Sequence, residues 1–61
     1  MNPIEAITQS ARRAGGSVSS VRAREIVEWI MTHRPETNYE DPADVDHAFG
    51  LFVSQQSRSQ P

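Results

Sequence analysis

Residues 19–35, with the sequence SSVRAREIVEWIMTHRP, decide the fold of this chain. Serines open the stretch, and a serine at such a place caps a helix by accepting a hydrogen bond from a free amide of the first turn. Pro35 closes it, because proline disfavours helical geometry in the residue before it. Between these limits the apolar residues recur at helical spacing, so we predict a helix over residues 19–34. The sequence leaves open which serine of the run Ser17-Val18-Ser19-Ser20 is the cap.

The apolar surface of this predicted helix is wider than one small neighbour covers. At about 100° per residue its apolar side chains span an arc of roughly 200°, which leaves a narrow polar side. Ile26, Val27 and Ile30, or their equivalents, are expected in the core. Trp29 at one margin of the arc and Met31 at the other cannot both face the same small core, so we expect one margin to be a docking surface.

A shorter helix is predicted before this stretch, over residues 3–14. Asn2 is suited to cap its first turn, and Pro3 has no amide to leave unpaired at the first helical position. The Gly15-Gly16 pair is a natural stop. The predicted apolar stripe of this helix consists of Ile4, Ile7, Ala11 and Ala14.

A third helix is predicted over residues 42–53, where Asp41 serves as the cap and Pro42 takes the first helical position. Gly50 falls inside this helix and costs roughly 1 kcal/mol against alanine. Tyr39 lies in the polar loop before it. We expect Tyr39 to cap the core and to keep its hydroxyl in contact with water or a polar partner.

No stretch alternates with the two-residue period of a strand. We therefore predict an all-α chain, a small three-helix bundle with an orthogonal or helix-turn-helix-like corner, as a single domain over residues 1–53. Residues 54–61 carry nothing to bury and are predicted to form a disordered tail.

Length and composition argue against catalysis. The chain has 61 residues, no cysteine and a net charge of −2. So short a chain hardly encloses a substrate pocket as well as a core, and it contains neither a nucleophile elbow nor a phosphate-cradling glycine loop. We expect no enzyme activity, no cofactor and no small-molecule substrate. No apolar run reaches the roughly 18 residues that span a bilayer, so we expect a cytoplasmic protein with no membrane partner.

An acidic segment invites a metal interpretation, because residues 36–46 hold five acids and precede His47. Their spacing does not match a calcium loop, and helix capping and the helix dipole already explain Asp41 and Asp44. Nothing in the sequence brings His33 to His47, and no thiolate or third ligand accompanies them. We predict no metal site.

A basic segment supplies one candidate function, since residues 6–24 hold four arginines and no acid. The spacing of a helix-turn-helix is present at Ala11, Gly15, Ser17 and Val21. In that motif the last of these positions is the aliphatic anchor of the second helix. DNA contacts would then come from Arg12, Arg13, Ser19, Ser20, Arg22 and Arg24. The motif is incomplete, because polar residues or glycine replace its usual apolar residues at Ser10, Gly16 and Arg24.

We favour the other candidate function, a non-catalytic interaction protein that regulates or inhibits a larger protein. The binding surface is predicted on the central helix and on part of the third helix. Its candidate residues are Trp29, Met31, Val27 and Leu51. The expected partner is another protein or a second copy of this chain, and a small DNA-binding regulator is the alternative.

Overall fold

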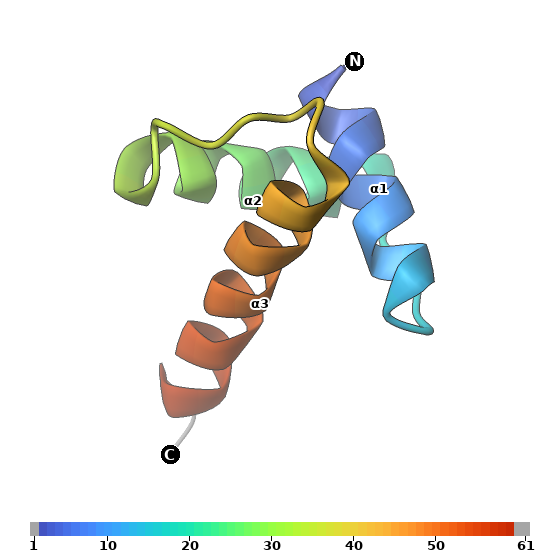
Figure 1. The fold of residues 1–61 in the computed structure, drawn as a ribbon. Coiled ribbons are helices and arrows are strands. Elements are labelled where there is room, and N and C mark those ends of the chain that lie inside the picture. The colour runs from blue at the N-terminus through green and yellow to red at the C-terminus, as the bar shows by residue number, and fades with distance from the viewer. Residues whose placement is uncertain (1, 60–61) are drawn as a thin grey trace.

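The computed structural model describes the backbone of residues 2–59 and the side chains of residues 2–56. It contains three helices, α1 (Pro3–Arg13), α2 (Ser20–His33) and α3 (Pro42–Ser59). Each helix packs against the other two, and the helices cross at steep angles instead of running alongside one another (Figure 1). The predicted all-α, three-helix architecture is confirmed, and the described residues contain no strand.

Side-chain caps fix where the helices start. Asn2 Oδ1 accepts a hydrogen bond from a first-turn amide at 2.9 Å, and Asp41 Oδ1 accepts one from Ala43 N at 3.1 Å. Ser19 Oγ accepts from Arg22 N at 3.1 Å, which identifies Ser19 as the serine that caps α2. Each of these bonds satisfies an amide that has no partner within its own helix.

Glycine ends α1 as predicted. Gly15 has a φ of +88°, a left-handed conformation that glycine adopts without the clash a Cβ would cause. The turn lets Gly16 N donate to Ala11 O at 3.0 Å. Ala14, predicted in the apolar stripe, is instead the exposed C-cap, because the helix closes one residue earlier. The buried residues of α1 are Ala6, Ile7, Ser10 and Ala11.

The core is aliphatic apart from one aromatic ring, and all three helices contribute to it. Ile26 and Ile30 of α2 are 1% and 0% exposed, as the helical periodicity predicts. The buried cluster consists of Ala6, Ile7, Ala23, Ile26, Val27, Ile30, Val45, Ala48 and Phe52. Removing this apolar surface from water, at about 25 cal/mol per Å², is the main force that holds the helices together.

The end of α3 differs from the prediction, since the helix runs to Ser59 and not to Val53. Residues 54–59, predicted as part of a disordered tail, are helical. No glycine or proline follows Gly50 until the last residue, so nothing in the chain forces an earlier stop. Contact with α2 also supports the extension, because Arg22 Nη2 donates to Gln56 Oε1. The part of the predicted tail at residues 60–61 lies outside the described residues.

The loop between α2 and α3 is held by its own polar contacts. Thr37 is buried and its hydroxyl donates to Arg34 O at 2.8 Å, while Asn38 N donates to Asp44 Oδ2 at 2.8 Å. Tyr39 packs against the core as predicted. Its hydroxyl, expected to meet water or a polar partner, is instead buried without a hydrogen bond to any described residue, because the pinned loop directs the ring inward. This burial raises the pKa of Tyr39.

Candidate protein-binding surface

The two margins of the apolar arc on α2 meet different surroundings. The Trp29 ring contacts Phe52 of α3 edge-on, with 5.5 Å between the ring centroids, and it stacks on His33 at 4.4 Å. Met31 is 52% exposed. The structure therefore covers the margin that carries Trp29 and leaves the margin that carries Met31 open.

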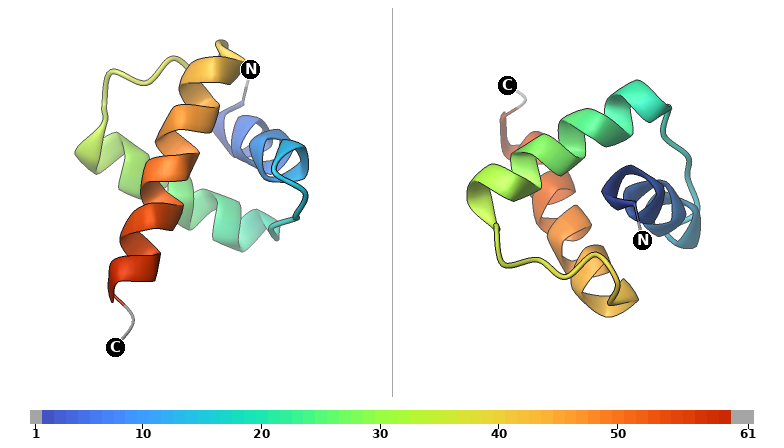
Figure 2. Two further views of the ribbon diagram at one scale, coloured as in Figure 1. Left: turned by 60° about the horizontal axis from the view of Figure 1, so that its bottom comes forward. Right: turned by 90° about the horizontal axis from the view of Figure 1, so that it is seen from above.

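The open side of α2 carries a second apolar side chain. Val21 and Met31, 71% and 52% exposed, are the two most exposed large apolar residues of the described chain. They lie nearly three helical turns apart on the same side of the helix. Figure 2 shows α2 along one edge of the molecule, with α1 and α3 both on its inner side. We call this stripe the outer face of α2, and it consists of Val21, Arg24, Glu28 and Met31.

An open groove borders the outer face where α2 meets the start of α1. This α1–α2 groove has a volume of about 250 Å³ and is lined by Asn2, Pro3, Ile4, Arg24, Val27, Glu28 and Met31. Val27, one of the predicted binding residues, is 5% exposed. It belongs to the core and contributes to the wall of the groove, not to the free surface.

Leu51 lies apart from this groove. It is 37% exposed on α3 and lines neither the α1–α2 groove nor a second groove between α1 and α3. This α1–α3 groove has a volume of about 360 Å³ and is lined by Ser10, Arg13, Ala14, Asp46, Phe49, Gly50 and Val53. The structure thus brings Met31 and Val27 to one groove and leaves Trp29 and Leu51 outside it.

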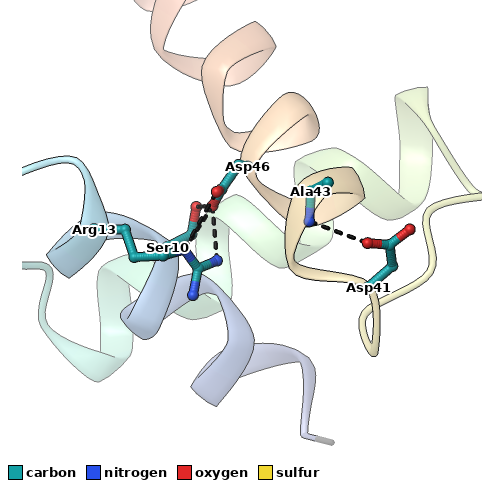
Figure 3. A network of polar contacts seen from close by, with 5 residues as sticks. All are labelled: Ser10, Arg13, Asp41, Ala43 and Asp46. Atoms are coloured by element: carbon teal, nitrogen blue, oxygen red, sulfur yellow. Dashed lines mark hydrogen bonds and ion pairs between the residues drawn. The ribbon is translucent and has the colours of Figure 1, made fainter.

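A polar network that sequence patterns do not predict joins α3 to α1 beside the second groove (Figure 3). Asp46 Oδ1 accepts hydrogen bonds from Ser10 Oγ at 2.6 Å and from Arg13 Nη2 at 2.7 Å. The bond from Arg13, and next the bond from Ser10, holds the pKa of Asp46 below its usual range. The bond to Asp46 in turn raises the pKa of Arg13. The signal in the sequence is a serine on the buried face of α1, since a buried hydroxyl needs a partner.

The arginines of the basic segment are largely engaged with acids. Within the described residues they form the ion pairs Arg13–Asp46, Arg22–Glu25 and Arg24–Glu28. The Arg22 guanidinium also lies over the Phe52 ring, 5.3 Å from its centroid. Among the other predicted DNA contacts, Arg12 and Ser20 are exposed, and Ser19 is occupied as the cap of α2.

The helix-turn-helix interpretation fails at its anchor. Ala11 is buried and Gly15 makes the turn, as the spacing predicts. Val21, which the motif would bury, is instead 71% exposed. The anchoring role assigned to Val21 is wrong, because the chain leaves the turn so that Val18 packs against the core in its place.

Comparisons with known proteins add no assignment. No protein-family model matches the chain, and no curated protein or solved structure gives a significant match. Within the described residues, no group of three or more His, Asp or Glu side chains is placed to hold a metal ion. None of the described helices is long and apolar enough to cross a membrane.

Proposed function

We propose that this chain is a non-catalytic interaction protein that acts by binding another protein through the outer face of α2. Small regulators and inhibitors act in this way, by covering part of a larger protein. One observation carries the proposal: Val21 and Met31, the two most exposed large apolar side chains of the described residues, share this face.

The chemistry of the face suits protein binding. Water is a poor solvent for large apolar side chains, so a partner that covers both of them gains the free energy of their burial. Met31 has a flexible, polarisable side chain that adapts to the shape of a partner. The α1–α2 groove beside it offers a concave site for an apolar anchor, and the charged pair Arg24–Glu28, which lies between Val21 and Met31, supplies polar contacts.

Retention of proteins from a lysate of the cells that make this chain tests the proposal. Immobilised wild type is compared with Met31→Glu, which adds a charge to the outer face without entering the core. Val53→Glu is the matched control, because Val53 is 47% exposed on α3, away from the outer face. Circular dichroism first establishes that both variants are helical.

We expect Met31→Glu to lose at least one protein that wild type and Val53→Glu both retain, because a desolvated carboxylate is costly in an apolar contact. The proposed function would be overturned if both variants lost the same proteins. It would also be overturned if neither variant lost any protein that wild type retains.

A further inference from the structure

The outer face of α2 is complementary to the outer face of a second α2 that runs in the opposite direction. Its residues stand at positions 21, 24, 28 and 31, the spacing of one stripe along a helix. Position 26 lies midway between 24 and 28, and also midway between 21 and 31. Reversing the helix about this position therefore exchanges Arg24 with Glu28 and Val21 with Met31.

We propose that a second copy of this chain binds the outer face with its α2 antiparallel to the first, about a two-fold axis at position 26. This inference rests on the proposed function and deepens it by naming the partner. Arg24 then faces Glu28 of the second copy, and Val21 faces Met31 of the second copy. A two-fold interface requires such reciprocity, because each contact occurs twice.

The charged residues are already placed for this pairing. Arg24 Nε and Glu28 Oε2 lie 3.7 Å apart along one helix, and their side chains are 73% and 67% exposed. Such an exposed pair is weak, so each side chain adjusts to a further partner at little cost. Two copies join their pairs into a network of four alternating charges, which favours the antiparallel register over its neighbours.

The α1–α2 groove supplies the apolar part of the contact. Met31 lines this groove together with Ile4 and Val27. Val21 of the second copy, placed opposite Met31, enters the groove. The pairing thereby removes from water the most exposed large apolar side chain of the described residues, and does so twice in each dimer.

The contact is small, which sets its expected strength. At a rise of 1.5 Å per residue the stripe is about 15 Å long. A stripe of this length on one helix is expected to bury less than the roughly 800 Å² per partner of a standard stable interface. We therefore expect a dimer that dissociates in the micromolar range or above, with the charge pairs selecting the register.

Charge reversal, followed by sedimentation equilibrium of the full chain, tests the pairing. Arg24→Glu places glutamates opposite one another across the axis, and Glu28→Arg places arginines there. Each single variant should dimerise at least about tenfold more weakly than wild type, whereas the double variant should recover the wild-type affinity. Arg12→Glu makes the same charge change on the exposed surface of α1 and should leave dimerisation unchanged.

An equimolar mixture of the two single variants gives the sharpest outcome. The charged positions of the outer face are both glutamate in one chain and both arginine in the other, so the mixture should dimerise more tightly than either variant does alone. A wild-type chain that stays monomeric up to about 1 mM, or single variants that dimerise like wild type, would overturn the pairing. A monomeric chain that loses a lysate protein on Met31→Glu would refute the pairing and leave the proposed function standing.

Discussion

Individual polar side chains add to the apolar packing of α1 against α3. Ser10 is 2% exposed, and its hydroxyl donates to Asp46, which also accepts from Arg13. Arg13 and Asp46 are themselves 41% and 47% exposed, so solvent screens their attraction and the ion pair contributes modestly. The hydrogen bond of the Ser10 hydroxyl is more important for stability than its single contact suggests. Without this bond the buried hydroxyl would carry the full cost of its desolvation.

Asp46 should make the folded state less stable in acid. Arg13, and next Ser10, lower the pKa of Asp46 in the folded state, so the unfolded state takes up the proton more readily. The stabilisation is fully present above the ordinary aspartate pKa of about 4 and is lost as the pH falls through the lower folded-state value. Urea unfolding at a series of pH values should show this loss in wild type and a flatter profile in Asp46→Asn.

Ser10→Ala is the matched variant for this experiment, since it removes one of the two donors to Asp46. Its acid profile should lie between those of wild type and Asp46→Asn. If Asp46→Asn and wild type lose stability in parallel below pH about 4, Asp46 is not the group responsible.

Gly50 and Gly15 should respond in opposite directions to alanine. A Cβ at Gly50 meets nothing within 4 Å, so Gly50→Ala should stabilise the chain by up to about 1 kcal/mol. Gly15 has a φ of +88°, and Gly15→Ala should destabilise the chain by about 1 kcal/mol. Midpoints of urea unfolding measure both effects. A Gly50→Ala chain less stable than wild type would contradict the open surroundings of that glycine.

At the scale of the helices, starts are easier to predict than ends. A start depends on a cap within the same few residues, and Asn2 and Asp41 are the caps that the sequence predicts correctly. For α2 the sequence indicates only a run of serines, and the structure identifies Ser19 as the cap. The end of α3 depends partly on another helix, because Arg22 reaches across to Gln56 and lies over Phe52. Propensity within residues 54–59 does not reveal a contact with a residue more than thirty positions earlier.

Removing the Arg22 side chain should loosen the last turns of α3. Arg22→Ala loses both the hydrogen bond to Gln56 and the contact with the Phe52 ring, at a cost of about 0.5–1 kcal/mol. Amide hydrogen exchange should quicken in residues 54–56 in particular. Arg24→Ala is the control, because its guanidinium pairs with Glu28 of the same helix. Equal exchange rates in the two variants would show that Arg22 does not support α3.

The candidate binding surface, like the helix bounds, could be predicted only in part from the sequence. Periodicity alone predicts that the arc of α2 is too wide for one neighbour, but the choice between Trp29 and Met31 depends on how α3 crosses α2. Phe52 of α3 packs against Trp29, so the margin of the arc that carries Met31 is the one that stays open. The Ser10–Asp46 bond was missed for the same reason, since its partners are 36 residues apart and meet only through the packing of α1 on α3.

For the molecule as a whole, we predict no binding to duplex DNA tighter than a weak nonspecific level at physiological salt. The chain has a net charge of −2 and its arginines are largely paired with acids, so few counterions would be released from phosphates. Fluorescence anisotropy with duplex DNA measures this. Salt-sensitive and sequence-selective binding that Arg12→Ala weakens would contradict the prediction and favour the DNA-binding alternative.

The outer face of α2 underlies both the function and the self-pairing proposed for this chain, and disulfide trapping tests it most directly because the chain has no cysteine. Antiparallel pairing brings position 24 of one copy opposite position 28 of the other, and a disulfide forms only between such close positions. A mixture of Arg24→Cys and Glu28→Cys chains, mildly oxidised, should therefore yield mainly the mixed disulfide. The same mixture with Met31→Glu added to both chains should yield little. A random distribution of mixed and like disulfides, unchanged by Met31→Glu, would contradict the pairing.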